Sequence, residues 1–258
     1  MNKKLFMIVA VLVLVVSLVA CNDKKPKTDE TDPFDVGSKG EYALAYKEKI
    51  ASIEKAHRAE QTKILEDDPE YDLTLFTNLA YDLVYVDDDD IPELVVTNPG
   101  YYTALYTYAD GKVVYCMKDE SNPEDEHGWA FGAAGNGGYD YSPKLNVIRN
   151  YNNDYAGLIR YITYNKIDST SHQLVPVYDK ELKVFYFTDK NQNGEVDEDE
   201  LNNFSEEATA YYFGSQKLSE EEFNAKLFDD FFDELSGKKA ANEMNSALDT
   251  LNAVANAE

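Results

Sequence analysis

The chain has 258 residues, with 24 basic and 49 acidic side chains and a formal net charge of −25. This charge repels nucleic acid and anionic lipid head groups and attracts cations, so the composition argues against a nucleic-acid partner. Solubility alone explains most of the acids, but not those that stand at the spacing of metal ligands.

The first residues have the pattern of an export signal. Lys3 and Lys4 precede an apolar stretch over residues 5–16, and small residues follow it. The ending Leu18-Val19-Ala20-Cys21 resembles the lipobox of bacterial lipoproteins. This resemblance implies that residues 1–20 are removed and that Cys21 becomes the lipid-modified first residue, anchored at the extracytoplasmic face of the cell membrane. The alternative is a retained membrane helix, for which ~20 apolar residues are needed.

Signal removal takes two lysines and no acid, which leaves a mature net charge of −27. Acylation of Cys21 leaves Cys116 without a partner for an intrachain disulfide, and we expect it to be a buried, inert thiol. Residues 21–40 are polar and contain two prolines. They predict a disordered tether between the lipid and a domain over residues 41–235.

A helix is predicted from Glu41 to about Pro69. Apolar or aromatic residues recur there at intervals of three and four, which is typical of a helix packed on one face. The stripe consists of Tyr42, Tyr46, Ile50, Ile53, His57 and Ile64. We interpret His57 as a packed residue rather than a ligand, because no second histidine or cysteine stands at helical spacing from it.

The period then changes to two, which predicts a series of short strands. Their ranges are 81–86, 93–97, 101–108, 112–117, 138–141, 146–151, 155–164, 173–177 and 182–187. Asp110-Gly111 predicts a tight hairpin turn between the third and the fourth. Short consecutive strands rich in aromatic residues favour an antiparallel meander.

The end of the chain is predicted to be helical. Ser219 and Glu222 have the spacing of a capping box, and an apolar helical face is expected from Phe223 to Leu235. A tail over residues 236–258 has a second apolar side, which fits a packed helix, a partner helix or a frayed end equally well. The fold class is therefore α+β: an antiparallel β-meander sheet with an N-terminal helix and C-terminal helices.

Residues 189–200 match every required position of the EF-hand calcium loop. Calcium is a hard cation that prefers six to eight oxygen ligands, and this spacing lets oxygens converge on one ion. Gly194 permits the sharp turn, and Val196 anchors the loop to the core. The predicted ligands are Asp189, Asn191, Asn193, Glu195 through its backbone carbonyl, Asp197 and Glu200. The alternative is an acidic turn without a metal.

The flanks of this loop differ from the EF-hand. Residues 182–187 alternate like a strand, whereas an EF-hand enters from a helix. The exit, residues 198–212, is predicted to be helical. We therefore expect an unpaired strand–loop–helix variant of low affinity, since extracellular calcium modules typically have dissociation constants of ~0.1–1 mM. Such a site would act as a structural staple.

A second acidic run, residues 86–96, resembles the Asp-rich turn of FG-GAP and VCBS-type repeats, in which alternate acids hold calcium between two strands. Matched by position, Asp87, Asp89 and Glu93 correspond to family ligands. Tyr85 stands where the family has its first aspartate, and Asp88 and Asp90 replace both family glycines. The alternative is a solvated strand connection fixed by Pro92.

Residues 81–115, 138–148 and 212–227 resemble a group of Gram-positive-type bacterial surface lipoproteins of unknown role. The resemblance implies a calcium-bearing, sheet-rich, surface-anchored domain. It assigns no activity.

Signatures of catalysis are missing from the sequence. The three histidines stand far apart, and neither a zinc-binding spacing nor a Gly-x-Ser-x-Gly motif is present. We therefore expect a non-catalytic, lipid-anchored protein that uses Ca²⁺ as a structural staple and binds an extracellular ligand, glycan or peptide. The alternative is a calcium-dependent hydrolase acting on cell-wall or polysaccharide substrates. The sequence predicts no oligomeric state.

Overall fold

The computed structural model describes residues 36–71, 79–98, 102–118, 129–130, 137–197, 199–202, 204–235 and 242–256. The predicted signal sequence and Cys21 lie outside these residues. Within the described part of the chain, no helix combines the length and the apolar character that crossing a bilayer requires.

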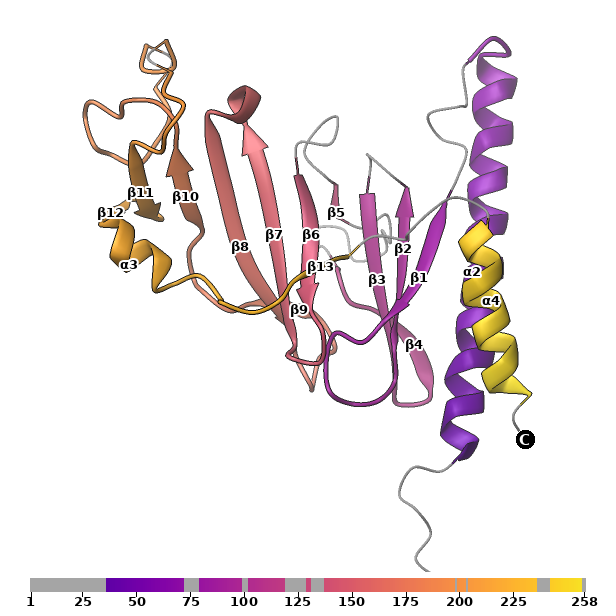
Figure 1. The fold of residues 1–258 in the computed structure, drawn as a ribbon. Coiled ribbons are helices and arrows are strands. Elements are labelled where there is room, and N and C mark those ends of the chain that lie inside the picture. Colours follow the sequence, from indigo (N-terminus) through magenta and orange to yellow (C-terminus); the bar gives the residue numbers. More distant parts are fainter. Residues whose placement is uncertain are drawn as a thin grey trace, which may run out of the picture. The chain divides into compact units, whose positions relative to one another are not determined.

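Two helices pack together on the first sheet. Helix α2 (Val36–Asp67) begins earlier than predicted, so residues 36–40 are helical rather than tether. Tyr42, Tyr46 and Ile50 of the predicted stripe are buried. Helix α4 (Asn242–Ala255) lies alongside α2, with Leu251 fully buried, so the tail is a packed helix (Figure 1).

The first sheet is antiparallel, with the order β1-β2-β3-β4. Its strands are β1 (Ala80–Val84), β2 (Glu93–Asn98), β3 (Tyr102–Ala109) and β4 (Lys112–Tyr115), and β5 (Trp129–Ala130) pairs with β3. Both residues of the predicted hairpin turn have positive φ, 53° at Asp110 and 75° at Gly111, which suits a tight turn between twisted strands.

The second sheet is also antiparallel and has the order β12-β11-β10-β8-β7-β6-β13, with β9 paired to β8. The short 3-10 helix η3 (Tyr155–Gly157) connects β7 to β8. The strands are β6 (Gly137–Ser142), β7 (Val147–Asp154), β8 (Ile159–Ile167), β9 (Leu174–Pro176), β10 (Leu182–Phe185), β11 (Ala210–Phe213), β12 (Gln216–Leu218) and β13 (Asp233–Glu234).

Backbone hydrogen bonds join the two sheets. The amides of Lys144 and Asn146 donate to the carbonyls of Tyr85 (2.9 Å) and Val86 (2.8 Å). The Leu174 amide donates to the Cys116 carbonyl at 2.7 Å. The acidic turn that follows Val86 therefore lies at the junction of the sheets. Cys116 is buried, as expected.

The structure confirms the α+β class and the antiparallel meander between N- and C-terminal helices, although the strands form two sheets. The helix predicted from Phe223 to Leu235 is wrong. The predicted capping box is present and starts helix α3, but this helix spans only Glu220–Asn224. The chain then crosses the second sheet in an irregular path. Phe228 and Phe232 pack there with ring centroids 4.7 Å and 6.3 Å from Tyr164, so apolar burial does not require a helix.

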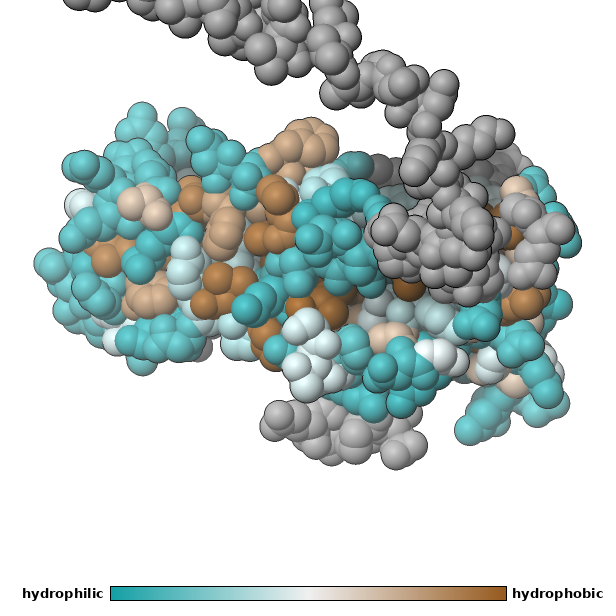
Figure 2. Space-filling view, turned by 90° about the horizontal axis from the view of Figure 1, so that it is seen from below, coloured by the Kyte–Doolittle hydropathy of each residue, from teal (hydrophilic) through white to brown (hydrophobic). Residues whose placement is uncertain are grey.

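The surface agrees with the acidic composition. Seen from below, it is mainly hydrophilic, with separate apolar patches rather than one continuous apolar field (Figure 2). Single exposed apolar residues such as Leu44 and Phe231 are common on folded proteins.

Candidate metal and ligand sites

The loop that matches the EF-hand pattern is an excursion between two antiparallel segments. It follows β10 and is closed at its base by a bridge between Phe187 and Phe204. Phe185 and Phe187 are fully buried and stack with centroids 4.8 Å apart, which fixes the entering segment. The entry from a strand is as predicted. The predicted exit helix is wrong, because the chain makes turns at residues 199–202 and then enters β11.

Asp189, at position one of the loop, is buried and turned inward. Its Oδ1 accepts a hydrogen bond from the Gln192 amide at 2.6 Å, and its Oδ2 accepts from the Gly194 amide at 3.1 Å. The hydroxyl of Tyr212, from β11, also donates to Oδ2. Burial raises the pKa of Tyr212, and its hydrogen bond to the Asp189 carboxylate raises that pKa further, so the phenol stays a donor.

Glu200, at position twelve, is 4% exposed. Its Oε1 accepts a hydrogen bond from the Lys190 amide at 2.7 Å, which closes the loop on itself. Its Oε2 is buried and has no hydrogen-bond partner among the described residues. Among the described residues, no lysine, arginine or histidine forms an ion pair with Asp189 or Glu200. Two carboxylates are thus buried without a cationic side chain.

The middle of the loop is curled by its own side chains. Asn191 Oδ1 accepts from the Asn193 amide (3.0 Å), and Asn193 Oδ1 accepts from the Glu195 amide (2.8 Å). The Asn191 side-chain amide donates to Asp197 Oδ2. The Glu195 side chain is exposed, which leaves its backbone carbonyl as the group it could contribute.

Two further loop residues have the predicted structural roles. Gly194 has φ of 70°, and a Cβ atom there would lie 2.9 Å from the Tyr212 ring, so both conformation and space require glycine. Val196 packs against the core cluster of Ile159, Phe185 and Tyr212. These contacts hold the middle of the loop against the second sheet.

The donor set of this loop fits calcium. Every group it offers is an oxygen, as a hard cation requires, and the orphaned Glu200 oxygen is an acceptor that no described protein group satisfies. Among the described residues, oxygens of Asp189, Asp197 and Glu200 do not all lie within 4.8 Å of one another. The three carboxylates therefore do not form a closed ligand shell in this conformation, and Asp197 Oδ2 accepts the Asn191 side-chain amide instead.

The acidic turn between β1 and β2 brings its three predicted ligands together. Ligand oxygens of Asp87, Asp89 and Glu93 lie within 4.8 Å of one another. Glu93 is fully buried, and its two oxygens accept from the Val86 amide (2.9 Å) and the Thr107 hydroxyl (3.2 Å). The alternate spacing and the sheet register together make this cluster.

The electrostatics of this turn disfavour the ionised form of all three carboxylates at once. Burial raises the pKa of Glu93 to about 8, and the charges of Asp87 and Asp89 add to the rise, while hydrogen bonds from Val86 and Thr107 oppose it. Burial also raises the pKa of Asp89 to about 6, helped by Asp87. The cluster therefore takes up a proton or a cation near neutral pH.

The turn closes although both family glycines are replaced. Asp90 itself adopts the left-handed conformation, with φ of 60°, which aspartate tolerates better than most residues. Lys144 pairs with Asp90 at 2.9 Å. Pro92 accepts a hydrogen bond from the buried Tyr46 hydroxyl at 2.9 Å, which ties the turn to α2.

Comparison with protein-family models, with curated proteins and with solved structures finds no match for this chain. The assignment of both acidic sites therefore rests on their own geometry.

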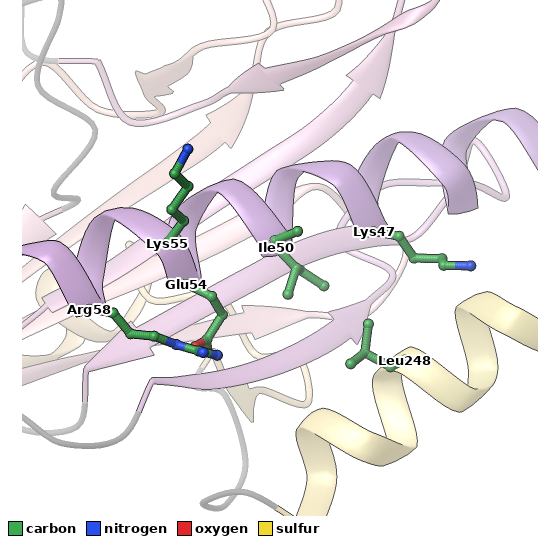
Figure 3. Close-up of a pocket in the computed structure, with 7 residues that line it drawn as sticks. Lys47, Ile50, Glu54, Lys55, Arg58 and Leu248 are labelled. Carbon is green, nitrogen blue, oxygen red and sulfur yellow. The ribbon is translucent and has the colours of Figure 1, made fainter.

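A cavity of about 420 Å³ lies between α2 and α4. Ile50 and Leu248 face it, while Lys47 and Lys55 point away from Glu54 (Figure 3). Glu54 accepts hydrogen bonds from Tyr81 (2.9 Å) and from Arg58 (3.2 Å). Its carboxylate thus links α2 to β1, which is a structural role.

Sequence reasoning missed Tyr212 as a supporting residue of the EF-hand-like loop. Its neighbours in sequence carry no signal, because the contact with Asp189 depends on β11 pairing with β10, where Tyr212 lies opposite Lys183.

Proposed function

We propose that this chain is a non-catalytic, calcium-binding protein, lipid-anchored through Cys21 at the extracytoplasmic face of the membrane, that binds an extracellular ligand. The observation that carries the calcium assignment is the buried, unpartnered oxygen of Glu200 beside a loop that also buries Asp189. Buried carboxylates without a paired cation are costly, and proteins normally resolve them by pairing or by metal coordination.

Calcium suits this loop better than magnesium. Magnesium demands near-ideal octahedral geometry and gives up its waters reluctantly, whereas calcium accepts a flexible set of carboxylate, amide and carbonyl oxygens. Asn191, Asn193 and the carbonyl of Glu195 are such neutral ligands. An ion held by Asp189 and Glu200 would join the two ends of the loop, and through Tyr212 it would fix the loop to β11.

The cluster of Asp87, Asp89 and Glu93 is proposed as a second cation site. A divalent ion would relieve the repulsion among its carboxylates and would displace the proton that Glu93 otherwise retains. Because the turn lies at the junction of the two sheets, an ion there would act as a structural staple between them.

The calcium assignment is tested by titrating the full chain with calcium, in detergent, by calorimetry and thermal unfolding. With a dissociation constant of ~0.1–1 mM, 10 mM calcium stabilises the fold by about 1.4–2.7 kcal/mol. Glu200→Gln should abolish the contribution of the loop and, in chelator, should be no less stable than the parent, because it removes a buried charge. The matched control is Glu206→Gln, at an exposed acid outside the loop. Equal calcium responses in both variants would refute the loop site.

The lipid anchor is tested separately. Cys21→Ala should abolish incorporation of a labelled fatty acid in expressing bacteria. Cys116→Ala, at the other cysteine, is the control and should leave incorporation unchanged. No incorporation into the parent chain, or equal incorporation into Cys21→Ala, would contradict acylation of Cys21 and favour the retained helix.

A further inference from the structure

A groove of about 340 Å³ crosses the second sheet on the face that carries Arg149, Tyr151 and Asn153 of β7. Across the sheet, Asn153 lies opposite Arg160, and Tyr151 lies opposite Ile162. The chain has three arginines, and two of them line this groove. In so acidic a chain, two arginines in one groove favour the binding of a specific ligand there.

One end of the groove pairs an arginine with an aspartate and has a second carboxylate, Glu234, opposite Asp140 on β13. Arg149 donates from Nε (3.1 Å) and Nη2 (2.6 Å) to the same oxygen of Asp140, and its guanidinium lies 4.4 Å from the centroid of the Phe232 ring. These contacts fix Arg149 in place. The other oxygen of Asp140 accepts no hydrogen bond from any described residue, so it is available to a donor on a ligand.

The other end has an unbalanced positive charge. Arg160 donates from Nε to Asn153 Oδ1 at 3.0 Å, which orients the guanidinium. No described carboxylate forms an ion pair with Arg160. Its two terminal nitrogens form a planar fork that matches the two oxygens of a carboxylate.

The floor between the two ends is flat and largely apolar. The Tyr151 ring lies over Gly138, where a Cβ atom would stand 2.7 Å from the Tyr151 hydroxyl. Glycine at this position therefore allows the ring to lie down on the sheet. Ile162 completes the floor. A flat ring with a polar hydroxyl can take the C–H face of a sugar and hydrogen-bond its substituents.

We propose that this groove binds a carboxylated sugar of the uronic-acid class, with its carboxylate on Arg160, its ring on Tyr151 and a hydroxyl donating to Asp140. The distance from Arg149 to Asn153, four residues along a strand, is about 13 Å, which suits one or two sugar rings. This inference names the ligand class for the binding role in the proposed function and rests on that role.

A peptide is less favoured for a structural reason. Extended peptides usually gain affinity by adding a strand to an open sheet edge. Strands β7 and β8, which carry most of the groove, are each paired on both sides, and β6 is paired with β13 at Asp140, so recognition in the groove depends on side chains. Salt screens charges beyond a Debye length of about 8 Å, so the acids that oppose an anionic ligand are the near ones, Asp140 and Glu234, at the end of the groove away from Arg160.

The test is NMR or calorimetric titration of the full chain, in detergent with calcium, against D-glucuronate, D-glucose and N-acetyl-L-alanine. Glucuronate should bind at least about tenfold more tightly than glucose, because only glucuronate has a carboxylate for Arg160. It should also bind more tightly than N-acetyl-L-alanine, which has a carboxylate but no sugar ring to lie on Tyr151. Arg160→Gln should weaken glucuronate binding about tenfold or more, and Arg160→Lys should restore only part of it. Tyr151→Leu should weaken glucuronate and glucose alike.

Arg58→Gln, the same substitution at an exposed arginine of α2, is the control and should leave binding unchanged. Equal binding of glucuronate and glucose, no effect of Arg160→Gln, or tighter binding of N-acetyl-L-alanine would each overturn the proposal. If the parent chain binds calcium but not glucuronate, the groove proposal alone is refuted. If it binds glucuronate but not calcium, the calcium assignment is refuted and the groove proposal stands.

Discussion

Tyr212 on β11 donates its hydroxyl hydrogen bond to Asp189, the first residue of the EF-hand-like loop. The two residues are 23 positions apart in sequence. The contact is buried, and it orients a carboxylate that already accepts the Gly194 amide. The position of the loop's first carboxylate is thus set by the neighbouring strand as well as by the loop.

Removing this hydroxyl should weaken calcium binding. We expect Tyr212→Phe to lower calcium affinity about tenfold, as is typical when an outer partner of a metal ligand is lost. The loss of a hydrogen bond to a charged group should also cost about 1.5–3 kcal/mol of stability in the parent fold. Calorimetric titration with calcium measures the first effect, and chemical unfolding measures the second.

Tyr211→Phe is the matched control, because Tyr211 is the adjacent strand residue and its ring packs on Phe223 instead, with centroids 4.9 Å apart. Unchanged calcium affinity in Tyr212→Phe would show that Asp189 is not a ligand or needs no orientation.

Substitution of Gly194 should be more damaging than its backbone angle alone implies. We expect Gly194→Ala to destabilise the fold by more than Gly111→Ala, because an added Cβ meets the Tyr212 ring at 2.9 Å and Ser215 Cα at 3.2 Å. Gly111 has a similar φ of 75° but nothing within 4 Å of the added atom, so it isolates the cost of the angle, about 1 kcal/mol. Thermal unfolding of both variants in chelator makes the comparison, and equal losses would contradict it.

The metal-free protein should lose stability as pH rises from about 4.5 to about 8. The pKa of Glu93 is raised to about 8 in the fold from an ordinary 4.5, so the folded state retains a proton that the unfolded state releases. The stabilisation is full below the lower value and is lost through the upper one. Each pKa unit corresponds to about 1.4 kcal/mol, so the effect is on the order of a few kcal/mol.

Glu93→Gln should flatten this pH dependence, measured by chemical unfolding in chelator. Glu48→Gln, at an exposed acid of α2, should leave it unchanged. Above pH 7, calcium should restore part of the stability that the parent chain has lost, whereas Glu93→Gln should show no such pH-dependent gain. A parent chain whose stability is level across the window would show that the buried carboxylate is already compensated.

The ion pair beside this cluster should matter little. Lys144 and Asp90 are 51% and 47% exposed, and exposed pairs usually contribute about 0–1 kcal/mol. We expect Lys144→Met to change the stability by less than 1 kcal/mol and to leave calcium affinity within about twofold. A larger change in affinity would mean that Lys144 competes with the cation for the turn.

Local chemistry was readable from the chain itself. The alternation of oxygen-bearing residues with a glycine at position six predicted a curled loop. Gly194 and Val196 have their predicted roles, although the residues that they contact, Tyr212 and Ile159, are distant in sequence. The capping box at Ser219 and the Asp110-Gly111 turn depend on neighbours in sequence. Asp87, Asp89 and Glu93 come together because the turn that joins two paired strands is short and restricts where their oxygens can lie.

Contacts between distant segments were decided by the tertiary structure. The predicted exit helix after the loop and the helix from Phe223 to Leu235 were wrong, because pairing with β10 and packing of Phe228 on Tyr164 satisfied those residues better. The burial of Glu200, the support of Asp189 by Tyr212 and the groove around Arg160 all depend on strand order and register. Sequence periodicity reports which face of a strand is apolar, but only the folded sheet decides which strands lie side by side.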